Sequence, residues 1–434
     1  MEKFPKKITG EVEISKTKIL EIESDVKNIP DFKEKIEECL YSPITEILDI
    51  ILAGAINLEA SDIHIEPEEE RTKLRIRIDG ILQDVLFLDL DIYKALLSRI
   101  KLLSGIKLNI FDRPQDGRFS VLIKELSIEI RTSSLPAEYG ESIVLRILNP
   151  KSLIELESLG LRKDLLKIVE TEIKKPNGMI IATGPTGSGK TTTLYAFLRK
   201  VTRPEIKIIT IEDPIEYHLE GISQTQVTPE KGYNFASGLK SIMRQDPDVI
   251  LVGEIRDLET VETALQASLT GHLVLTTLHT NDAAGVIARL TSLGAKISNV
   301  APALNMVIAQ RLVRKICKAC KRLEKITPDE LKKIKTELKN LKIKNIPKIS
   351  NNIKIPKITG CKECNFTGYR KRIGIFEVFL IDEKIEKIIL KEPPISEVEK
   401  LAKKKGMITM KQDGILKVLE GLTTLKEIER VMGE

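Results

Sequence analysis

Apolar and polar residues follow two different periods within the first 150 residues. From Ile44 to Asn57, apolar side chains recur every three to four residues, which predicts a helix with one buried face. Short runs between residues 61 and 148 alternate apolar and polar positions and predict strands, with a helical stretch at 91–105 between them. We therefore expect an α+β domain in this part of the chain.

After residue 159 the expected strands become almost wholly apolar. The runs GMIIAT, IKIITIED, DVILVGE and HLVLTTLHT alternate with longer helical patterns, which is typical of a parallel sheet covered by helices on both faces. Each run ends in polar or charged residues, and open sheets of this kind bind ligands at the carboxyl ends of their strands. The pattern predicts an α/β domain with a site along one edge of its sheet.

The strand pattern stops near Ile316, a Lys-rich insert follows, and the residues after Ile373 have mainly helical periodicity. These changes divide the chain into five expected segments. They are a leader of uncertain order at 1–40, the α+β domain at 41–150, the α/β domain at 151–312, the insert at 313–372 and a helical region at 373–434.

Composition and charge restrict the class of protein. Among 434 residues, 42% are hydrophobic and 30% are charged, which are globular values. No apolar run approaches about 18 residues, and the N-terminus lacks the apolar stretch of a secretory signal, so we expect a cytoplasmic protein. The segment from Arg314 to Lys357 contains 15 basic and 4 acidic residues, a net charge of +11. Because the whole chain has a net charge of +6, the rest of it carries −5. Because the basic excess is local and Trp is absent, direct nucleic-acid binding is disfavoured.

A phosphate-binding loop follows the run GMIIAT and precedes a helical pattern. The segment GPTGSGKT fits G-x-x-x-x-G-K-[ST], in which glycines let backbone N–H groups converge on phosphate oxygens. Lys190 supplies a positive charge to the triphosphate, and the Thr191 hydroxyl is a ligand for Mg²⁺. The predicted ATP-binding residues are Gly184, Pro185, Thr186, Gly187, Ser188, Gly189, Lys190, Thr191 and Thr192.

Two acids at strand ends provide the groups that hydrolysis of a bound nucleotide requires. Glu254 follows the run DVILVG, and we predict that it orients or deprotonates the attacking water. Glu212 ends the run IKIITIE, and we predict a carboxylate on the metal side of the site. The alternative for each acid alone is a helix cap or an ordinary surface charge.

Two histidines flank the run LVLTTL. Because His272 and His279 are seven residues apart, an odd offset, their side chains point to opposite faces of a strand. We favour His279, at the carboxyl end, as the sensor of the γ-phosphate. His272 is predicted either to belong to the same site or to fill a buried position at the start of the strand.

Four cysteines form two pairs, Cys317-x-x-Cys320 and Cys361-x-x-Cys364. Two such knuckles in a cytosolic chain favour tetrahedral Zn²⁺, and four thiolates leave no open position, so the metal would be structural. The alternatives are two disulfides or a redox pair.

An ordered series of segments resembles the type II secretion and type IV pilus assembly ATPases, a branch of the secretion ATPase superfamily. After the phosphate loop and the strand-end acids, the segments that carry the resemblance are ASDIHIEP, RIRIDG, RPQDGRF, TIEDPIEYHLEGISQTQV, ASGLKSIMRQDPDVILVGEIRD and TGHLVLTTLHTNDA. The resemblance extends from about Ser42 to Phe379. It implies a RecA-like P-loop motor domain preceded by a PAS-like domain, with ATP at their junction, a tetracysteine zinc subdomain and a ring-shaped hexamer.

The resemblance also implies roles for single residues. Glu212 falls in the Asp box of the family, Glu254 matches its catalytic glutamate, and His272 and His279 match its His box. Arg131 and Arg146 match arginines that complete the site from the N-terminal domain; the alternative is two ordinary strand arginines. Before RQDPD the family carries two arginines, of which this chain keeps Arg244 and replaces the other by Lys240.

The sequence therefore predicts a Mg-ATPase that drives assembly of a type IV pilus or a type II secretion pseudopilus. The resemblance implies a homo-hexamer at the inner face of the cell membrane, associated through an inner-membrane platform protein, without direct nucleic-acid binding. A pilus-retraction motor of the same superfamily is one alternative, although such motors typically lack the tetracysteine insert. A zinc-bearing nucleic-acid-binding module with a vestigial nucleotide site is the other.

Overall fold

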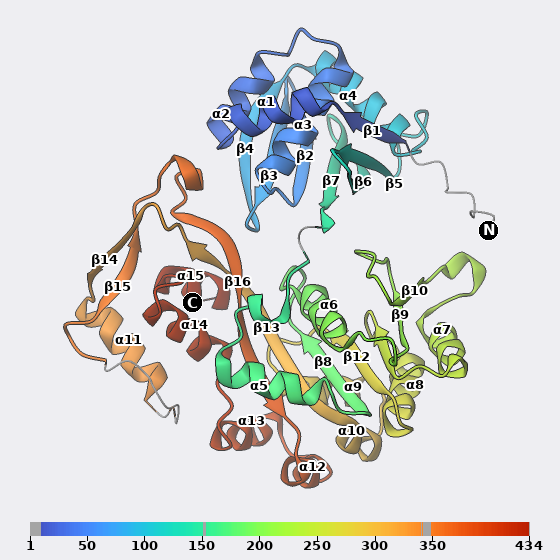
Figure 1. Ribbon diagram of the computed structural model, residues 1–434, viewed down its shortest axis with the longest axis vertical. Coiled ribbons are helices and arrows are strands. Elements are labelled where there is room, and N and C mark those ends of the chain that lie inside the picture. Colours follow the sequence, from blue (N-terminus) through green and yellow to red (C-terminus); the bar gives the residue numbers. More distant parts are fainter. Residues whose placement is uncertain (1–9, 151–152, 340, 342–348, 434) are drawn as a thin grey trace. The chain divides into compact units, whose positions relative to one another are not determined.

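The computed structural model describes residues 10–150, 153–339, 341 and 349–433, and these residues form two compact units (Figure 1). Unit 1 comprises Met1–Ser152 together with Cys317–Cys320 and Ile358–Arg370. Unit 2 comprises Leu153–Ile316, Lys321–Lys357 and Lys371–Glu434. Within the described ranges, no helix combines the length and the apolar character that crossing a membrane requires.

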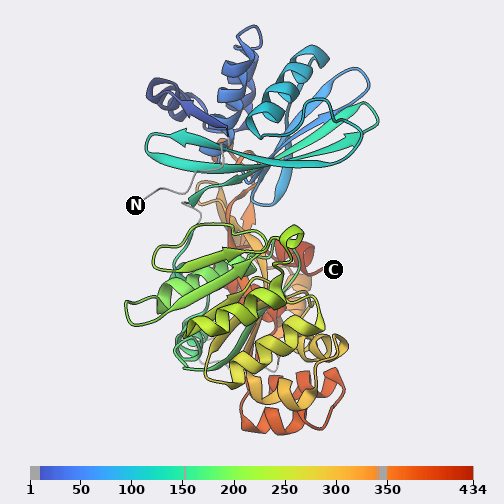
Figure 2. The ribbon, with the colours of Figure 1, turned by 90° about the vertical axis from the view of Figure 1, so that its right-hand side faces the viewer.

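Unit 1 is a seven-stranded sheet with helices on one face (Figure 2). The strand order is β1-β5-β6-β7-β2-β3-β4, and β1 runs parallel to β5 while the other pairs are antiparallel. The strands are β1 Glu11–Ile14, β2 Asp62–Pro67, β3 Thr72–Ile78, β4 Ile81–Leu88, β5 Gln115–Ile123, β6 Leu126–Ala137 and β7 Gly140–Leu148. The helices are α1 Lys16–Asp25, α2 Ile29–Glu37, α3 Ile44–Asn57 and α4 Leu90–Leu103. Alternation places one side of each strand in the core, as Ile128 and Ile130 on β6 illustrate.

The first forty residues differ from the expected leader of uncertain order. Their described part forms β1, α1 and α2, which bury Val12, Ile22 and Phe32 in the core of unit 1. Phe32 packs so closely on α3 that a Cβ added to Gly54 would lie 2.2 Å from its ring. The elements are short and each buries only a few apolar residues, so no long period marks them in the sequence. Their order comes from tertiary packing, in part on α3, which follows α2 in the chain.

Unit 2 is a seven-stranded sheet in the order β10-β9-β11-β12-β8-β13-β16. The strands from β10 to β13 in this order pair in parallel. The strands are β8 Gly178–Thr183, β9 Ile208–Glu212, β10 Ser223–Gln226, β11 Val249–Val252, β12 Leu273–Leu278, β13 Leu304–Ile316 and β16 Tyr369–Leu380. The helices among them are α5 Lys163–Glu172, α6 Lys190–Val201, α7 Phe235–Ile242, α8 Leu258–Leu269, α9 Gly285–Ser292 and α10 Ile297–Ala303.

Both faces of this sheet are buried. On β8, Met179 and Ile181 pack in a core with α7 to α10, whereas Ile180 and Ala182 pack in a second core with α5 and α6. Because successive side chains of such a strand pack into the cores on opposite faces of the sheet, every position must be apolar. This explains the unbroken apolar runs in the sequence. The predicted α/β fold class, preceded by an α+β domain, is confirmed.

The remaining elements belong to the Lys-rich insert and the C-terminal region. They are β14 Lys321–Lys325, α11 Pro328–Leu338, β15 Lys354–Ile358, α12 Glu383–Ile389, α13 Ile395–Lys404, α14 Met410–Leu419 and α15 Leu425–Met432. Strands β14 and β15 form a two-stranded sheet. The first cysteine pair lies between β13 and β14 in the chain, and the second lies between β15 and β16. Both pairs belong to unit 1. There, Asn365 Oδ1 accepts the backbone N–H of Ile29 at 2.7 Å.

Candidate active site

The phosphate loop joins β8 to α6 and depends on its glycines. Gly184, Gly187 and Gly189 have φ values of 144°, 77° and 89°, which side-chain-bearing residues rarely adopt. A Cβ on Gly184 would also lie 2.5 Å from the backbone oxygen of Gln310 and 2.8 Å from Ser188 Oγ. The loop therefore brings its backbone close to the start of α6, where free N–H groups bind anions.

Two buried polar groups fit a phosphate ligand in this loop. Lys190 is 9% exposed, and its ammonium donates to the carbonyl oxygens of Gly184 at 2.8 Å and Pro185 at 3.1 Å. Burial lowers the pKa of Lys190, and the negative charge of Glu254 acts against that shift. Ser188 is 4% exposed, and its hydroxyl makes no hydrogen bond to any described residue. An unpaired buried hydroxyl beside a buried ammonium is expected where an anion binds.

Gln310 on β13 supports the loop and escaped the sequence analysis. It is 1% exposed, and its Nε2 donates to the backbone oxygen of Ser188 at 2.8 Å. No motif marks this residue, because its position depends on the parallel pairing of β13 with β8. Only a correct alignment of these two strands could have placed it beside the loop.

Glu254 and His279 lie together at the carboxyl ends of β11 and β12. Glu254 Oε2 is 3.9 Å from His279 Nε2, and Glu254 Oε1 is 2.5 Å from Arg256 Nη2. Partial burial and the charge of Lys190 lower the pKa of His279, against the influence of Glu254, so the imidazole is neutral at pH 7. The structure thus brings together three predicted site residues: Lys190, Glu254 and His279.

Glu212 ends β9 as predicted, but its carboxylate is engaged by neutral donors. It is 3% exposed and accepts hydrogen bonds from Thr210 Oγ1 at 2.6 Å, from Gln224 Nε2 at 3.1 Å and from the Tyr195 hydroxyl. Burial and the negative charge of Glu212 raise the pKa of Tyr195, which keeps that hydroxyl a donor. Glu212 links β9 to β10 and α6, and its role towards a metal stays a prediction.

Three other predicted residues of unit 2 lie in different surroundings. His272 is at the opposite end of β12 from His279, where its Nδ1 is 3.0 Å from the backbone oxygen of Ala267. Arg244 is exposed and donates to the Ser241 hydroxyl at 3.2 Å. Thr191 is exposed in the first turn of α6. The hydrogen bonds and ion pairs found within the described ranges join neither His272 nor Arg244 to the phosphate loop.

Arg131 and Arg146 belong to a row of charged residues across the sheet of unit 1. The two arginines are direct partners on β6 and β7, and Arg146 is in turn opposite Asp62 on β2. Arg146 Nε lies 3.1 Å from Asp62 Oδ1, and Arg77 Nε lies 3.2 Å from Asp62 Oδ2. Asp62 is 5% exposed, so a nearly buried carboxylate fixes two guanidinium groups. Asp62 and Arg77 cannot be identified from the sequence alone, since their alignment with Arg146 depends on the strand register.

The four cysteines have the geometry of a tetrahedral metal centre. Their sulfur atoms all lie within 4.8 Å of one another, with Cys317–Cys361 and Cys320–Cys364 at 3.8 Å and Cys361–Cys364 at 3.7 Å. Zn–S bonds of about 2.3 Å give a tetrahedron with edges of about 3.8 Å, whereas a disulfide requires about 2.05 Å. The sulfur positions therefore fit zinc.

The surroundings of the sulfur atoms also fit a cation. The backbone N–H groups of Cys361 and Gly368 both donate to Cys364 Sγ at 3.2 Å, as expected around metal-bound thiolates. Burial and the neighbouring thiols raise the pKa of Cys320 to about 12. If all four sulfurs were thiolates, they would require a positive charge among them, which Zn²⁺ would supply.

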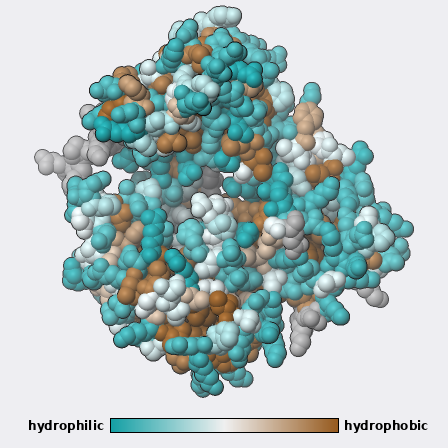
Figure 3. Space-filling view, turned by 180° about the vertical axis from the view of Figure 1, so that it is seen from behind, coloured by the Kyte–Doolittle hydropathy of each residue, from teal (hydrophilic) through white to brown (hydrophobic). Residues whose placement is uncertain are grey.

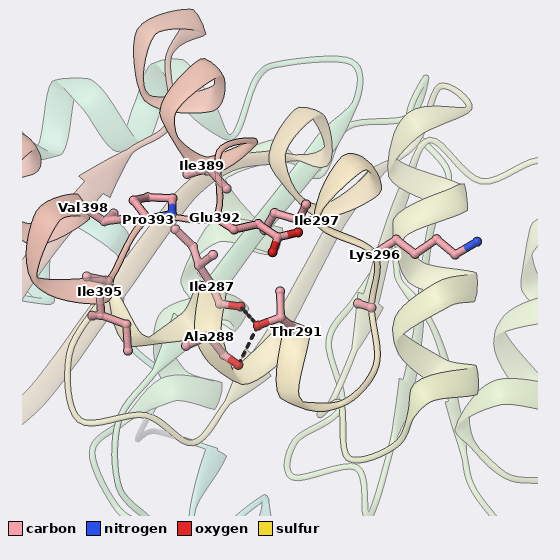
Figure 4. A pocket seen from close by; sticks show the side chains of 12 residues that line it. Ile287, Ala288, Thr291, Lys296, Ile297, Ile389, Glu392, Pro393, Ile395 and Val398 are labelled. Atoms are coloured by element: carbon pink, nitrogen blue, oxygen red, sulfur yellow. Dashed lines mark hydrogen bonds between the residues drawn. The ribbon is translucent and has the colours of Figure 1, made fainter.

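A pocket of about 300 Å³ lies elsewhere in unit 2, between α9, α10 and the α12–α13 connection (Figure 4). Most of its lining is apolar; the Glu392 carboxylate points inward, and Lys296 points away. Thr291 Oγ1 donates to the backbone oxygens of Ile287 and Ala288, so its hydroxyl is satisfied. Apolar side chains also gather at this end of unit 2 when the molecule is seen from behind (Figure 3). None of the predicted nucleotide-binding residues lines the pocket, which is separate from the candidate active site.

The chain is similar to known proteins over nearly its whole length. The family described as type II/IV secretion system protein matches residues 37–430. Type II secretion system protein E of Dickeya dadantii is 42% identical over 412 residues, which cover 94% of this chain and 79% of that protein. The type IV pilus assembly ATPase PilB of Thermus thermophilus is 39% identical over 404 residues, covering 91% of this chain and 44% of PilB. Among solved structures, the pilus retraction motor PilT with bound ADP has a TM-score of 0.58 at 28% identity, covering 88% of this chain and 95% of that one.

Proposed function

Because the chain belongs to the family of type II/IV secretion system proteins and is a secretion or pilus ATPase, we propose that it is a hexameric Mg-ATPase motor of the assembly type. In this proposal, a ring of six copies hydrolyses ATP to extend a type IV pilus or a type II secretion pseudopilus. The proposal depends on one observation: Lys190, Glu254 and His279 lie close together beside the phosphate loop.

Each of these residues has a distinct part in hydrolysis. The Lys190 ammonium leaves the carbonyl oxygens of Gly184 and Pro185 and pairs with the phosphates of ATP. Glu254 holds the attacking water and accepts its proton. The neutral imidazole of His279 donates a hydrogen bond to the γ-phosphate, which is how the protein distinguishes ATP from ADP.

Mg²⁺, when bound, neutralises charge on the phosphates. Thr191 would hold it through the hydroxyl, and Glu212, fixed by Thr210 and Gln224, would supply a negative charge on the metal side. Arg131 and Arg146 would add positive charge as the phosphoryl group transfers, an effect worth about 10³ to 10⁵ in rate in other systems. The four cysteines would hold a structural Zn²⁺.

An assembly motor is favoured over the two alternatives. The identity to the secretion protein E and PilB is 42% and 39%, whereas it is 28% to the retraction motor PilT. The tetracysteine cluster also favours the assembly branch. A module with a vestigial nucleotide site would not require Glu254 and His279 beside Lys190. We further propose attachment to the inner face of the cell membrane through a platform protein, without direct nucleic-acid binding.

The test is ATP hydrolysis by the purified chain. K190A should lose nucleotide binding and turnover, whereas E254Q should bind ATP and fail to hydrolyse it. K200A is the matched control for K190A, because Lys200 is on the same helix but forms only surface ion pairs with Glu157 and Glu170. Continued hydrolysis in both K190A and E254Q would refute the proposal. Electron microscopy of the E254Q protein with ATP tests for the six-membered ring.

A further inference from the structure

Glu377 is a buried acid that forms no ion pair with any described residue. It lies on β16 and is 5% exposed, and its Oε1 accepts the backbone N–H of Ala283 at 2.8 Å. The backbone N–H of Met410 also hydrogen-bonds to this carboxylate. Burial raises the pKa of Glu377, and the two backbone N–H groups act against that rise. The carboxylate thus joins two backbone segments that are distant in the sequence.

The first of these segments is the loop 279–284 between β12 and α9, which begins at His279. On its other side, the loop is fixed to the phosphate site. The Thr280 backbone N–H donates to Thr183 Oγ1 at 2.8 Å, and Thr183 is the last residue of β8 before the phosphate loop. The loop is therefore held between two attachments, Thr183 on one strand and Glu377 on another.

The second segment is the start of α14, which is attached to β16 at two consecutive residues. Met410 begins α14 and bonds to Glu377, and the Phe376 backbone N–H donates to Asp413 Oδ2 at 2.9 Å. Asp413 is fully buried and also accepts Arg162 Nη1 at 2.6 Å. A displacement of α14 would therefore act directly on residues 376 and 377 of β16.

We propose that Glu377 is a positioning residue for ATP hydrolysis. By holding Ala283, it sets the place of His279, and through Met410 it makes that place depend on α14. The distance of 3.9 Å between His279 Nε2 and Glu254 Oε2 is longer than a hydrogen bond, so a small shift of the loop decides whether the imidazole engages the site. This inference rests on the proposed role of His279 at the γ-phosphate.

Substitutions of Glu377 test the inference through steady-state kinetics. E377L removes the acceptor for both N–H groups, whereas E377Q keeps one oxygen acceptor of the same shape. We expect E377L to lower kcat about tenfold and to leave KM within about twofold, because the phosphate loop is untouched. E377Q should recover most of the kcat. E172L and E172Q are matched controls, because Glu172 is 7% exposed at the end of α5 and, among the described residues, its ion pair is with Lys175, three residues further along the chain.

Amide hydrogen exchange with a non-hydrolysable ATP analogue provides a second readout that does not depend on turnover. In the wild type, both 279–285 and 409–416 should gain protection when the analogue binds. In E377L, protection of 279–285 should no longer be accompanied by protection of 409–416. If E377L does not fold, E377A, which also removes both acceptors, replaces it in this measurement, and the same loss of coupled protection is expected; coupled protection that persists in that variant would overturn the inference.

The outcomes separate this inference from the proposed function. Wild-type kcat in E377L, together with a slow H279A, would overturn the role of Glu377 alone. An equal loss in E377L and E172L would also overturn it, because general destabilisation would explain both. Wild-type kcat in K190A would instead overturn the ATP site itself.

Discussion

Replacing Gln310 by leucine should weaken nucleotide binding without destabilising the protein. The Nε2 group of Gln310 is the donor to the backbone oxygen of Ser188, whereas its Oε1 is buried with no partner in the described residues. Q310L removes that donor, which costs about 1–3 kcal/mol because a buried carbonyl loses its partner. It also removes an unpaired acceptor, which offsets the loss in folding free energy.

Nucleotide affinity and folding stability should respond differently to Q310L, because only the affinity depends on how the loop is held before the nucleotide binds. A loop that is no longer held at Ser188 must be ordered by the ligand itself, so a cost of about 1.4 kcal/mol appears as a tenfold weaker affinity. We expect the Kd for an ATP analogue, measured by isothermal titration calorimetry, to rise about tenfold. The midpoint of urea unfolding should stay close to that of the wild type.

A control on the same strand tests the specificity of this effect. Asn305 on β13 also donates through its side-chain amide, since its Nδ2 bonds to the backbone oxygen of Asn177 at 2.8 Å, but this bond is exposed and lies far along the strand from the phosphate loop. N305L should leave the Kd unchanged. An unchanged Kd in Q310L, or an equal rise in both variants, would refute the argument that Gln310 supports the loop.

Three further predictions concern the metal centre, the C-terminal helix and unit 1. C364S removes one sulfur ligand and the acceptor of two backbone N–H groups, so zinc content by mass spectrometry should fall well below one ion per chain; a full complement of zinc would contradict this. Glu427 is buried, which opposes its ionisation, but hydrogen bonds from Arg430 and Arg314 prevail and lower its pKa to about 2. Because the folded pKa lies below the ordinary 4.5, this stabilisation is present above pH 4.5 and is lost as pH falls towards 2. Between pH 7 and pH 3, the free energy of urea unfolding should therefore fall by about 2 kcal/mol more in the wild type than in E427Q, and parallel curves would exclude this contribution. D62N should lower kcat several-fold by releasing Arg146, whose exposed side chain is held by that carboxylate; wild-type kcat in D62N would show that Asp62 does not position Arg146.

Local patterns in the sequence were sufficient for the phosphate loop and the family. The segment that contains Lys190 is contiguous, so its chemistry is visible without knowledge of the fold. The predictions of the family, of the α/β fold class and of an ATPase are confirmed. Glu254 and His279 were also placed correctly at strand ends, because parallel strands bring their carboxyl ends to one edge.

Residues whose roles depend on strand register could not be predicted in this way. No motif marks Gln310 or Glu377 within its long strand, and their partners Ser188 and Ala283 are about one hundred residues away in the chain. For Glu212, the sequence correctly predicts a strand end but not the three donors that surround its carboxylate. Thr210 is on β9 itself, but Gln224 and Tyr195 come from β10 and α6, which no local period connects to β9.

Unit 1 is built from three separate stretches of the chain, so a single proteolytic cut should not release its N-terminal part. Residues 1–152 share that unit with the two short cysteine segments, and the Ile29 N–H on α2 bonds to Asn365 in one of them. A protease that cuts once between the two units near residue 153 would leave a nicked molecule whose N-terminal fragment stays attached. Release of that fragment would require a second event that unfolds the cysteine segments; if they hold the proposed Zn²⁺, a chelator would be one such event.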